Sequence, residues 1–141
     1  MDSNLKKSIM LDHYNNPTNK GITDSKGYYK VNMNSESCID DLDFIVKIED
    51  GIIKDARFDG EACVISTSSS SILMNLIIGK KVDEALEIID NFEAMVDERN
   101  YDKNILEEAN VFDEIYKQAN RKKCALLPFM GLKEIISKYK E

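Results

Sequence analysis

The sequence predicts an α+β fold, in which one helix and a three-stranded antiparallel sheet come first and four helices then pack on the sheet. Two observations predict it. In the first half of the chain, apolar and polar residues alternate on both sides of Asp50-Gly51, a pair that readily forms a tight hairpin turn. From residue 64 onward, apolar residues recur every three or four positions, which is the period of helices that face a core.

The elements of the first half follow in order. Apolar residues at helical spacing predict a helix over residues 5–14, and Pro17 ends it. Alternation over residues 28–34 predicts a strand, and residues 35–41 form a loop that leads into the hairpin.

The second half is predicted to be helical throughout. Its first helix has no internal breaker and ends at Gly79. Its last helix contains Pro128, which we expect in the first turn, where a proline leaves no backbone hydrogen bond unmade. The four predicted helices cover residues 64–78, 82–96, 105–118 and 124–139, and the third has the weakest pattern.

Length and charge limit the classes of function. The chain has 141 residues, so we expect one domain over residues 1–141. Its net charge of −7 argues against nucleic-acid binding, which requires a basic face. Residues 83–114 hold twelve acidic and two basic side chains, whereas residues 117–140 hold seven basic and one acidic. We interpret both segments as solvated helix faces, with a docking surface for a partner protein as the alternative.

The chain shows no sign of export or membrane insertion. It has no apolar run near the roughly 20 residues of a membrane span, and no apolar segment follows the charged N-terminus. A cytoplasmic location is therefore predicted. The three cysteines are odd in number and far apart, which disfavours a disulfide framework and favours reduced thiols.

Each cysteine falls at the edge of a predicted element. Cys38 is in the loop before the hairpin, Cys63 precedes a helix, and Cys124 is near the start of the last helix. A helix N-terminus favours an anionic thiolate, the form that binds metal and attacks sulfur. A free cysteine is also often a small buried apolar residue, and spacing alone does not decide between these interpretations.

A tetrahedral zinc site would need a fourth ligand beside three thiolates. Asp40 is two residues from Cys38, so both could reach one ion, although a loop carboxylate in water is the simpler interpretation. The single histidine, His13, lies in the first predicted helix, and we assign it a packing or docking role.

Five segments together resemble the U-type iron–sulfur cluster assembly proteins, the IscU, NifU and SufU family. The resemblance covers nearly the whole chain, and it implies the SufE/NifU-like fold. The segments are Asp12-His13-Tyr14-Asn15-Asn16-Pro17, Val31-Asn32-Met33-Asn34, Cys38-Ile39-Asp40, Gly60-Glu61-Ala62-Cys63-Val64-Ile65-Ser66 and Arg121-Lys122-Lys123-Cys124-Ala125-Leu126.

The resemblance implies a metal site made of Cys38, Asp40, Cys63 and Cys124. The SufU branch matches best, because sixty residues separate Cys63 from Cys124 and because Lys123 stands where the IscU branch has a histidine. That branch implies a zinc-dependent acceptor of persulfide sulfur from a SufS-type, pyridoxal-phosphate-dependent cysteine desulfurase. Cys38 would be the acceptor and Arg121 an assisting cation.

Two other functions use the same residues. The chain could be a scaffold on which a [2Fe–2S] cluster is assembled and passed to downstream cluster-assembly proteins, because thiolates bind both zinc and iron. It could also be an adaptor whose zinc is purely structural, although an aspartate ligand is unusual for such a site.

The sequence departs from the family pattern at three positions. Ile39 and Ala62 replace glycines that are usual before the aspartate and before the second cysteine, and Thr18 replaces a common arginine. If those glycine positions need a positive φ, the replacements would strain the backbone there.

Overall fold

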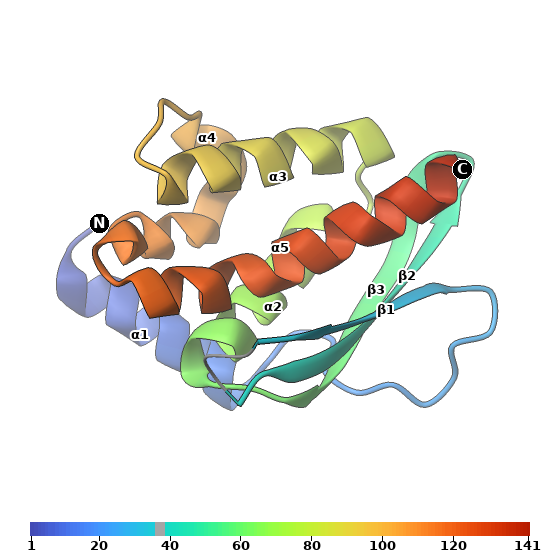
Figure 1. Cartoon of the computed structure of the whole chain (residues 1–141), viewed down its shortest axis with the longest axis horizontal. Helices are drawn as coiled ribbons and strands as arrows, with labels where there is room; N and C mark the ends of the chain where they lie inside the picture. The colour runs from blue at the N-terminus through green and yellow to red at the C-terminus, as the bar shows by residue number, and fades with distance from the viewer. Residues whose placement is uncertain (36–38) are drawn as a thin grey trace.

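The computed structural model describes residues 1–35 and 39–141, and in these the predicted order of a helix, a sheet and then helices is found (Figure 1). Helix α1 comes first, and the three strands form one antiparallel sheet in the order β1-β2-β3. The elements are α1 Ser3–Asn15, β1 Tyr29–Asn34, β2 Asp41–Glu49, β3 Ile52–Glu61, α2 Val64–Ile77, α3 Val82–Val96, α4 Lys103–Leu106, the 3₁₀ helices η1 Glu107–Phe112 and η2 Ile115–Lys117, and α5 Ala119–Lys140.

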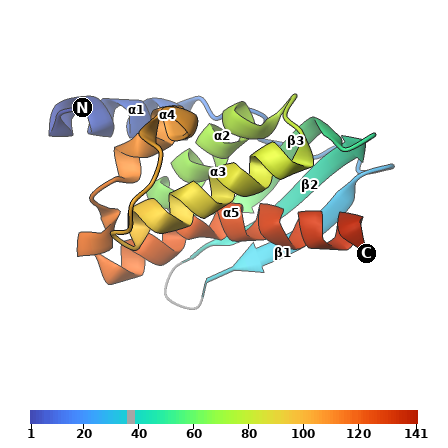
Figure 2. The ribbon, with the colours of Figure 1, turned by 90° about the horizontal axis from the view of Figure 1, so that it is seen from above.

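One face of the sheet is buried under helix α5. Val31, Phe44 and Phe58 lie opposite one another across the three strands, and all three are buried. Helix α5 crosses this face closely at Gly131, where a Cβ atom would lie 3.1 Å from side-chain carbons of Met33 and Phe44. In the view of Figure 1, α5 lies between α3 and the sheet, and in Figure 2 α3 and α5 run side by side. The absence of a side chain therefore lets the helix approach the strands.

A second part of the core lies between α3, α5 and the 3₁₀ segment. The Phe92 ring of α3 has its centroid 3.8 Å from that of Phe129 on α5 and 6.1 Å from that of Phe112 in η1. All three rings are almost completely buried. Aromatic contacts thus attach α3 to the rest of the molecule.

The prediction of a helix over residues 105–118 is wrong. A four-residue α-helix and two 3₁₀ helices occupy this segment, and Glu107 has a positive φ of 45°. The physical reason lies in the spacing of the buried side chains, since a 3₁₀ helix repeats every three residues. The side chains at that spacing are Leu106, Ala109, Phe112 and Ile115.

The last helix begins five residues earlier than predicted, at Ala119. Pro128 is therefore the tenth residue of α5 rather than a member of its first turn. A proline at an interior position has no N–H, so residue 128 cannot donate to the carbonyl four residues earlier. That carbonyl belongs to Cys124.

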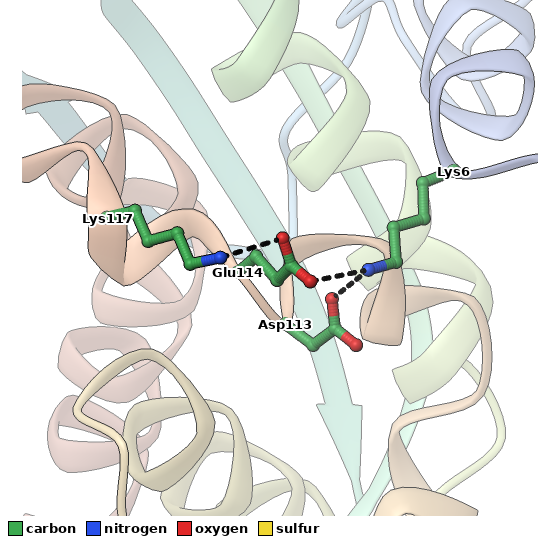
Figure 3. A network of polar contacts seen from close by, with 4 residues as sticks. All are labelled: Lys6, Asp113, Glu114 and Lys117. Carbon is green, nitrogen blue, oxygen red and sulfur yellow. Dashed lines mark hydrogen bonds and ion pairs between the residues drawn. The ribbon is translucent and has the colours of Figure 1, made fainter. Parts of the chain in front are cut away.

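An ion-pair network joins α1 to the segment between η1 and η2 (Figure 3). Lys6 lies 2.6 Å from Asp113 and 3.8 Å from Glu114, and Glu114 also lies 3.3 Å from Lys117. The hydrogen bond to Asp113 raises the pKa of Lys6 above its ordinary value. These contacts connect the first helix to the 3₁₀ segment.

Within the described residues, we find no helix with the length and apolar character needed to span a bilayer.

Candidate metal centre

Three of the four predicted ligands come together although they are distant in sequence. The ligand atoms of Asp40, Cys63 and Cys124 all lie within 4.8 Å of one another. Asp40 and Cys124 are buried, and Cys63 is partly exposed. The fourth predicted ligand, Cys38, lies outside the described residues. Two thiols and a carboxylate suit zinc or iron, whereas magnesium and calcium prefer oxygen ligands alone.

Asp40 precedes β2, and hydrogen bonds hold both of its carboxylate oxygens. The Cys63 N–H donates to Oδ1 at 2.9 Å, and the Ser66 hydroxyl donates to Oδ2 at 2.5 Å. Burial by itself would raise the pKa of Asp40. Hydrogen bonds from Ser66, from the Cys63 amide and from both thiols outweigh burial and hold this pKa below its ordinary value. The carboxylate is therefore oriented and anionic, as a metal ligand must be.

Gly60 permits the backbone approach that brings Asp40 to Cys63. Its φ is 130°, and a Cβ atom there would lie 2.2 Å from the carbonyl oxygen of Asp41. The residue pairs with Leu42, next to the point where β2 begins and β3 ends. A side chain at this position would push the two strands apart and separate the residues that follow them.

Cys63 is the N-cap residue of α2, as its position before a helix predicts. Its sulfur accepts a hydrogen bond from the Ser66 N–H at 3.4 Å. The helix N-terminus therefore points the Ser66 N–H, and with it partial positive charge, at this sulfur. Sequence position and structure agree for this residue.

For Cys124 the same expectation is wrong. It is the sixth residue of α5, beyond the first turn in which the helix terminus acts on charge. Its thiol lies 3.5 Å from the carbonyl oxygen of Asn120, and the side chain is almost completely buried. Of the adjacent basic residues, Lys122 pairs with Asp97 at 2.5 Å. The contacts of this thiol therefore come from the interior of the fold and not from a helix N-terminus.

A groove of about 650 Å³ runs beside Cys63. Arg121, the predicted assisting cation, lines it, and within the described part of the chain no ion pair engages this exposed side chain. Ile39 also lines the groove and is 70% exposed. A cation and an exposed apolar side chain therefore stand at the open side of the candidate centre.

The structure also shows the contacts of His13 and the backbone conformation of Ala62. His13 is buried away from the three ligands, with Nδ1 2.7 Å from the Ser71 hydroxyl and Nε2 3.0 Å from Glu108. It joins α1 to α2 and η1, so its role is packing. Ala62 is not among the residues with positive φ, so the alanine is not strained by its backbone conformation.

Ser66 is the residue at this site that the sequence analysis did not single out. It belongs to the run of small polar residues at the start of α2, and its side chain is completely buried. Its position three residues after Cys63, one helical turn along, is the signal that could have identified it.

The sequence matches the family model of the NifU-like N-terminal domain over residues 5–140. The chain belongs to this family. The IscU scaffold protein of Thermotoga maritima is 34% identical over 134 residues, which cover 95% of this chain and 94% of that protein. The zinc-dependent sulfurtransferase SufU of Bacillus subtilis is 33% identical over 135 residues, covering 95% and 90%.

A solved structure supports the fold of this family member. A candidate scaffold protein for iron–sulfur cluster assembly in the SUF system, from Fervidobacterium islandicum, superposes with a TM-score of 0.80. It is 28% identical, and the match covers 91% of this chain and 93% of that one. The predicted NifU-like fold and the family resemblance are thereby confirmed, and a place in iron–sulfur cluster assembly follows from the family.

Proposed function

We propose that this protein is a zinc-dependent sulfur acceptor that takes persulfide sulfur from a cysteine desulfurase in the cytoplasm. The observation that carries the proposal is the compactness of the candidate centre. In a tetrahedral zinc site, ligand atoms are separated by about 3.5–3.8 Å, as bond lengths of about 2.0–2.3 Å require. A separation of at most 4.8 Å among all three described ligand atoms is close to that spacing.

The short separations among the ligand atoms also argue against the alternative function, a scaffold for a [2Fe–2S] cluster. The four ligands of a [2Fe–2S] cluster are divided between two irons, so ligands on opposite irons lie farther apart than ligands on one ion. The described ligand set therefore suits a single ion better than two irons. The Bacillus subtilis relative, whose name states zinc dependence, matches over 95% of this chain and agrees with this choice.

The proposed ligands are Cys38, Asp40, Cys63 and Cys124. Zinc bound to them would keep the thiols deprotonated and the connecting segments ordered. Because a carboxylate is a harder ligand than a thiolate, Asp40 should leave the site exchangeable. This property separates a carrier from a protein whose zinc only supports the fold.

The proposed transfer step involves two cysteines and one sulfur atom. The Cys38 thiolate attacks the outer sulfur of the persulfide on the desulfurase. A new S–S bond forms on Cys38, the S–S bond of the desulfurase breaks, and its cysteine leaves as a thiolate. Arg121, which lines the groove beside Cys63, provides a cation near the transferred anionic sulfur. The groove is where we place contact with the desulfurase.

The decisive experiment measures alanine release by a SufS-type desulfurase, with and without the zinc-loaded protein. We expect strong stimulation that disappears in Cys38→Ala, together with a persulfide mass increase on the wild-type chain only. A Lys140→Ala variant, which removes an exposed cation at the C-terminal end of α5 and outside the lining of the groove, is the matched control. Zinc-loaded protein that neither stimulates release nor gains sulfur would contradict the acceptor function and leave the cluster scaffold and the structural-zinc adaptor.

A second candidate function is a scaffold for cluster assembly, favoured by the IscU scaffold of Thermotoga maritima at equal coverage. Downstream cluster-assembly proteins would then be the recipients. Anaerobic reconstitution with iron and sulfide separates the two functions, since a scaffold develops the visible absorption of a cluster that survives desalting.

A further inference from the structure

Ile39 is the most exposed large apolar residue in the described part of the chain. It is 70% exposed, whereas the other exposed apolar residues range from 41% for Tyr14 to 56% for Met1. The residue after it, Asp40, is buried and held through both carboxylate oxygens, so the backbone from which Ile39 projects is fixed. Because little of its surface is buried, Ile39 contributes little to the stability of the fold, and its apolar area is open to a partner.

Other apolar side chains surround Ile39 in the groove beside Cys63. Tyr14 of α1, itself 41% exposed, lines this groove, as do the partly buried Met10 and Ile65. The segment before β2, helix α1 and the start of α2 therefore share one apolar surface. A single exposed apolar residue is ordinary on a protein surface, whereas a group of them around a groove indicates a contact site.

The charged residues of the groove leave one cation without a counter-charge. Among the described residues, three charged side chains line it: Glu114, Lys117 and Arg121. Glu114 forms an ion pair with Lys117 at 3.3 Å and lies 3.8 Å from Lys6 (Figure 3). No ion pair engages Arg121 within the part of the chain that the structure describes. The groove therefore suits a partner that brings apolar side chains and a negative charge.

The persulfide-bearing segment of a cysteine desulfurase has this chemistry. The outer sulfur of a persulfide is an anion, as the sulfur of a thiolate is. In the proposed transfer, that sulfur must come close to the thiols of the candidate centre, and the groove lies beside Cys63. Charge complementarity with Arg121 and closeness to Cys63 thus select the same occupant.

We propose that Ile39 is a docking residue, whose side chain enters an apolar pocket beside the persulfide cysteine of the desulfurase. The inference rests on the proposed function. It deepens that function, because it names the side chain on which recognition of the sulfur donor depends.

The first test measures binding of the zinc-loaded protein to the SufS-type desulfurase of the same organism by titration calorimetry. Cysteine is left out, so no sulfur is transferred. Ile39→Ser should weaken binding by about 10-fold, since the apolar surface buried in the complex is lost. Ile39→Leu keeps an apolar side chain of the same size and should bind within about 3-fold of wild type.

Leu5→Ser is the matched control. Leu5 is 49% exposed on α1 and is not a lining residue of the groove. It precedes Tyr14 by nine residues, which is about two and a half helical turns and places it on the opposite side of α1. We expect this variant to bind the desulfurase as wild type does.

Two further measurements locate the effect of Ile39→Ser. Zinc affinity and the visible bands of bound Co²⁺ should equal those of wild type, because Ile39 is not a proposed ligand. With cysteine present, the concentration of protein that gives half-maximal alanine release should rise by about 10-fold, and maximal release should stay the same. Such a change in concentration alone is the signature of a docking residue.

The possible outcomes separate this inference from the proposed function. Wild-type affinity in Ile39→Ser, an equal loss in Leu5→Ser, or a loss accompanied by weaker zinc binding overturns the inference and leaves the acceptor function in place. Self-association of wild type that Ile39→Ser abolishes would make a second copy the occupant and overturn it too. Binding that depends on Ile39, in a protein that gains no persulfide, supports the inference and overturns the acceptor function. Wild-type protein that does not bind the desulfurase overturns both.

Discussion

Helices α2 and α3 follow one another and are nearly equal in length, yet the first half of α2 buries polar side chains where α3 buries apolar ones. Helix α3 buries an apolar stripe and exposes acidic residues, as an amphipathic helix should. Helix α2 buries six consecutive small polar residues, 66–71, none more than 3% exposed. Each serine among them has a hydrogen-bond partner, so burial leaves no hydroxyl unpaired.

The difference indicates a division of roles. The apolar side chains of α3 contribute stability through burial. The polar side chains of α2 contribute position, because their hydrogen bonds join Asp40, the α5 backbone and His13 to one helix. Substitutions in α3 should therefore change the free energy of unfolding, whereas those at the start of α2 should change metal binding.

The largest effect is expected from Phe92→Ala in α3. Removing a buried ring that contacts Phe112 and Phe129 should cost about 3–5 kcal/mol in the free energy of unfolding. Urea unfolding of the metal-free protein would measure the cost. At low denaturant the folded variant should bind zinc as wild type does. A large loss of zinc affinity would show that α3 also positions the metal centre, contrary to the division of roles.

Cys63→Ser, at the start of α2, should weaken metal binding and leave the free energy of unfolding unchanged. Serine is a good N-cap residue, so the helix should keep its cap and the metal-free protein should unfold as wild type does. Loss of a thiolate ligand should weaken zinc binding by more than about 100-fold, beyond what loss of an outer partner costs. Chelator competition and thermal unfolding would be compared, and retention of zinc would remove Cys63 from the ligand set.

Gly60→Ala tests the backbone that leads into α2. The added Cβ would lie 2.2 Å from the Asp41 carbonyl oxygen in a positive-φ conformation, and a cost of about 2–3 kcal/mol is expected. Gly27→Ala is the control, since φ is 81° there but no atom lies within 4 Å. Strain from φ alone should cost it only about 1–2 kcal/mol. Equal urea midpoints for the two variants would show that the close approach at Gly60 is unimportant.

The smallest effect is expected at the end of α3, where Asp97 pairs with Lys122 of α5. The hydrogen bond from Lys122 lowers the pKa of Asp97, so its stabilising contribution is present above the ordinary value of 3.8 and is lost as the pH falls through the lower folded value. Because the pair is partly exposed, Asp97→Asn should cost less than about 1 kcal/mol at pH 7. The difference from wild type should disappear well below pH 3.8, and a difference that persists there would exclude the ion pair as its cause.

Local patterns predicted most of the elements. The Asp50-Gly51 pair lies at the turn of the hairpin, and the apolar period of residues 82–96 matches α3, because both depend on contacts within a few residues. The segment over residues 105–118 was predicted wrongly, since apolar residues three apart are compatible with an α-helix until packing selects the 3₁₀ form. The start of α5 was missed because residues 120–123 are polar, and Ala119 alone gives no apolar period.

The candidate site divides in the same way. Residue types at family spacing pointed to Asp40, Cys63 and Cys124, but not to Ser66 or Gly60, whose roles depend on atoms of other elements. The hydrogen bond from Ser66 of α2 to the Cys124 carbonyl of α5 likewise depends on the packing of two helices that are far apart in sequence.

The sequence by itself determined the α+β class and the family, because periodicity, turn chemistry and residue type are local properties of the chain. Through the family resemblance it also predicted a set of thiol and carboxylate ligands. Only the tertiary structure decided that three residues up to 84 positions apart share one candidate site, and that a buried serine donates a hydrogen bond to the carboxylate among them. Both contacts join parts of the chain that are far apart in sequence. The packing of α2 against the sheet and against α5 brings them together.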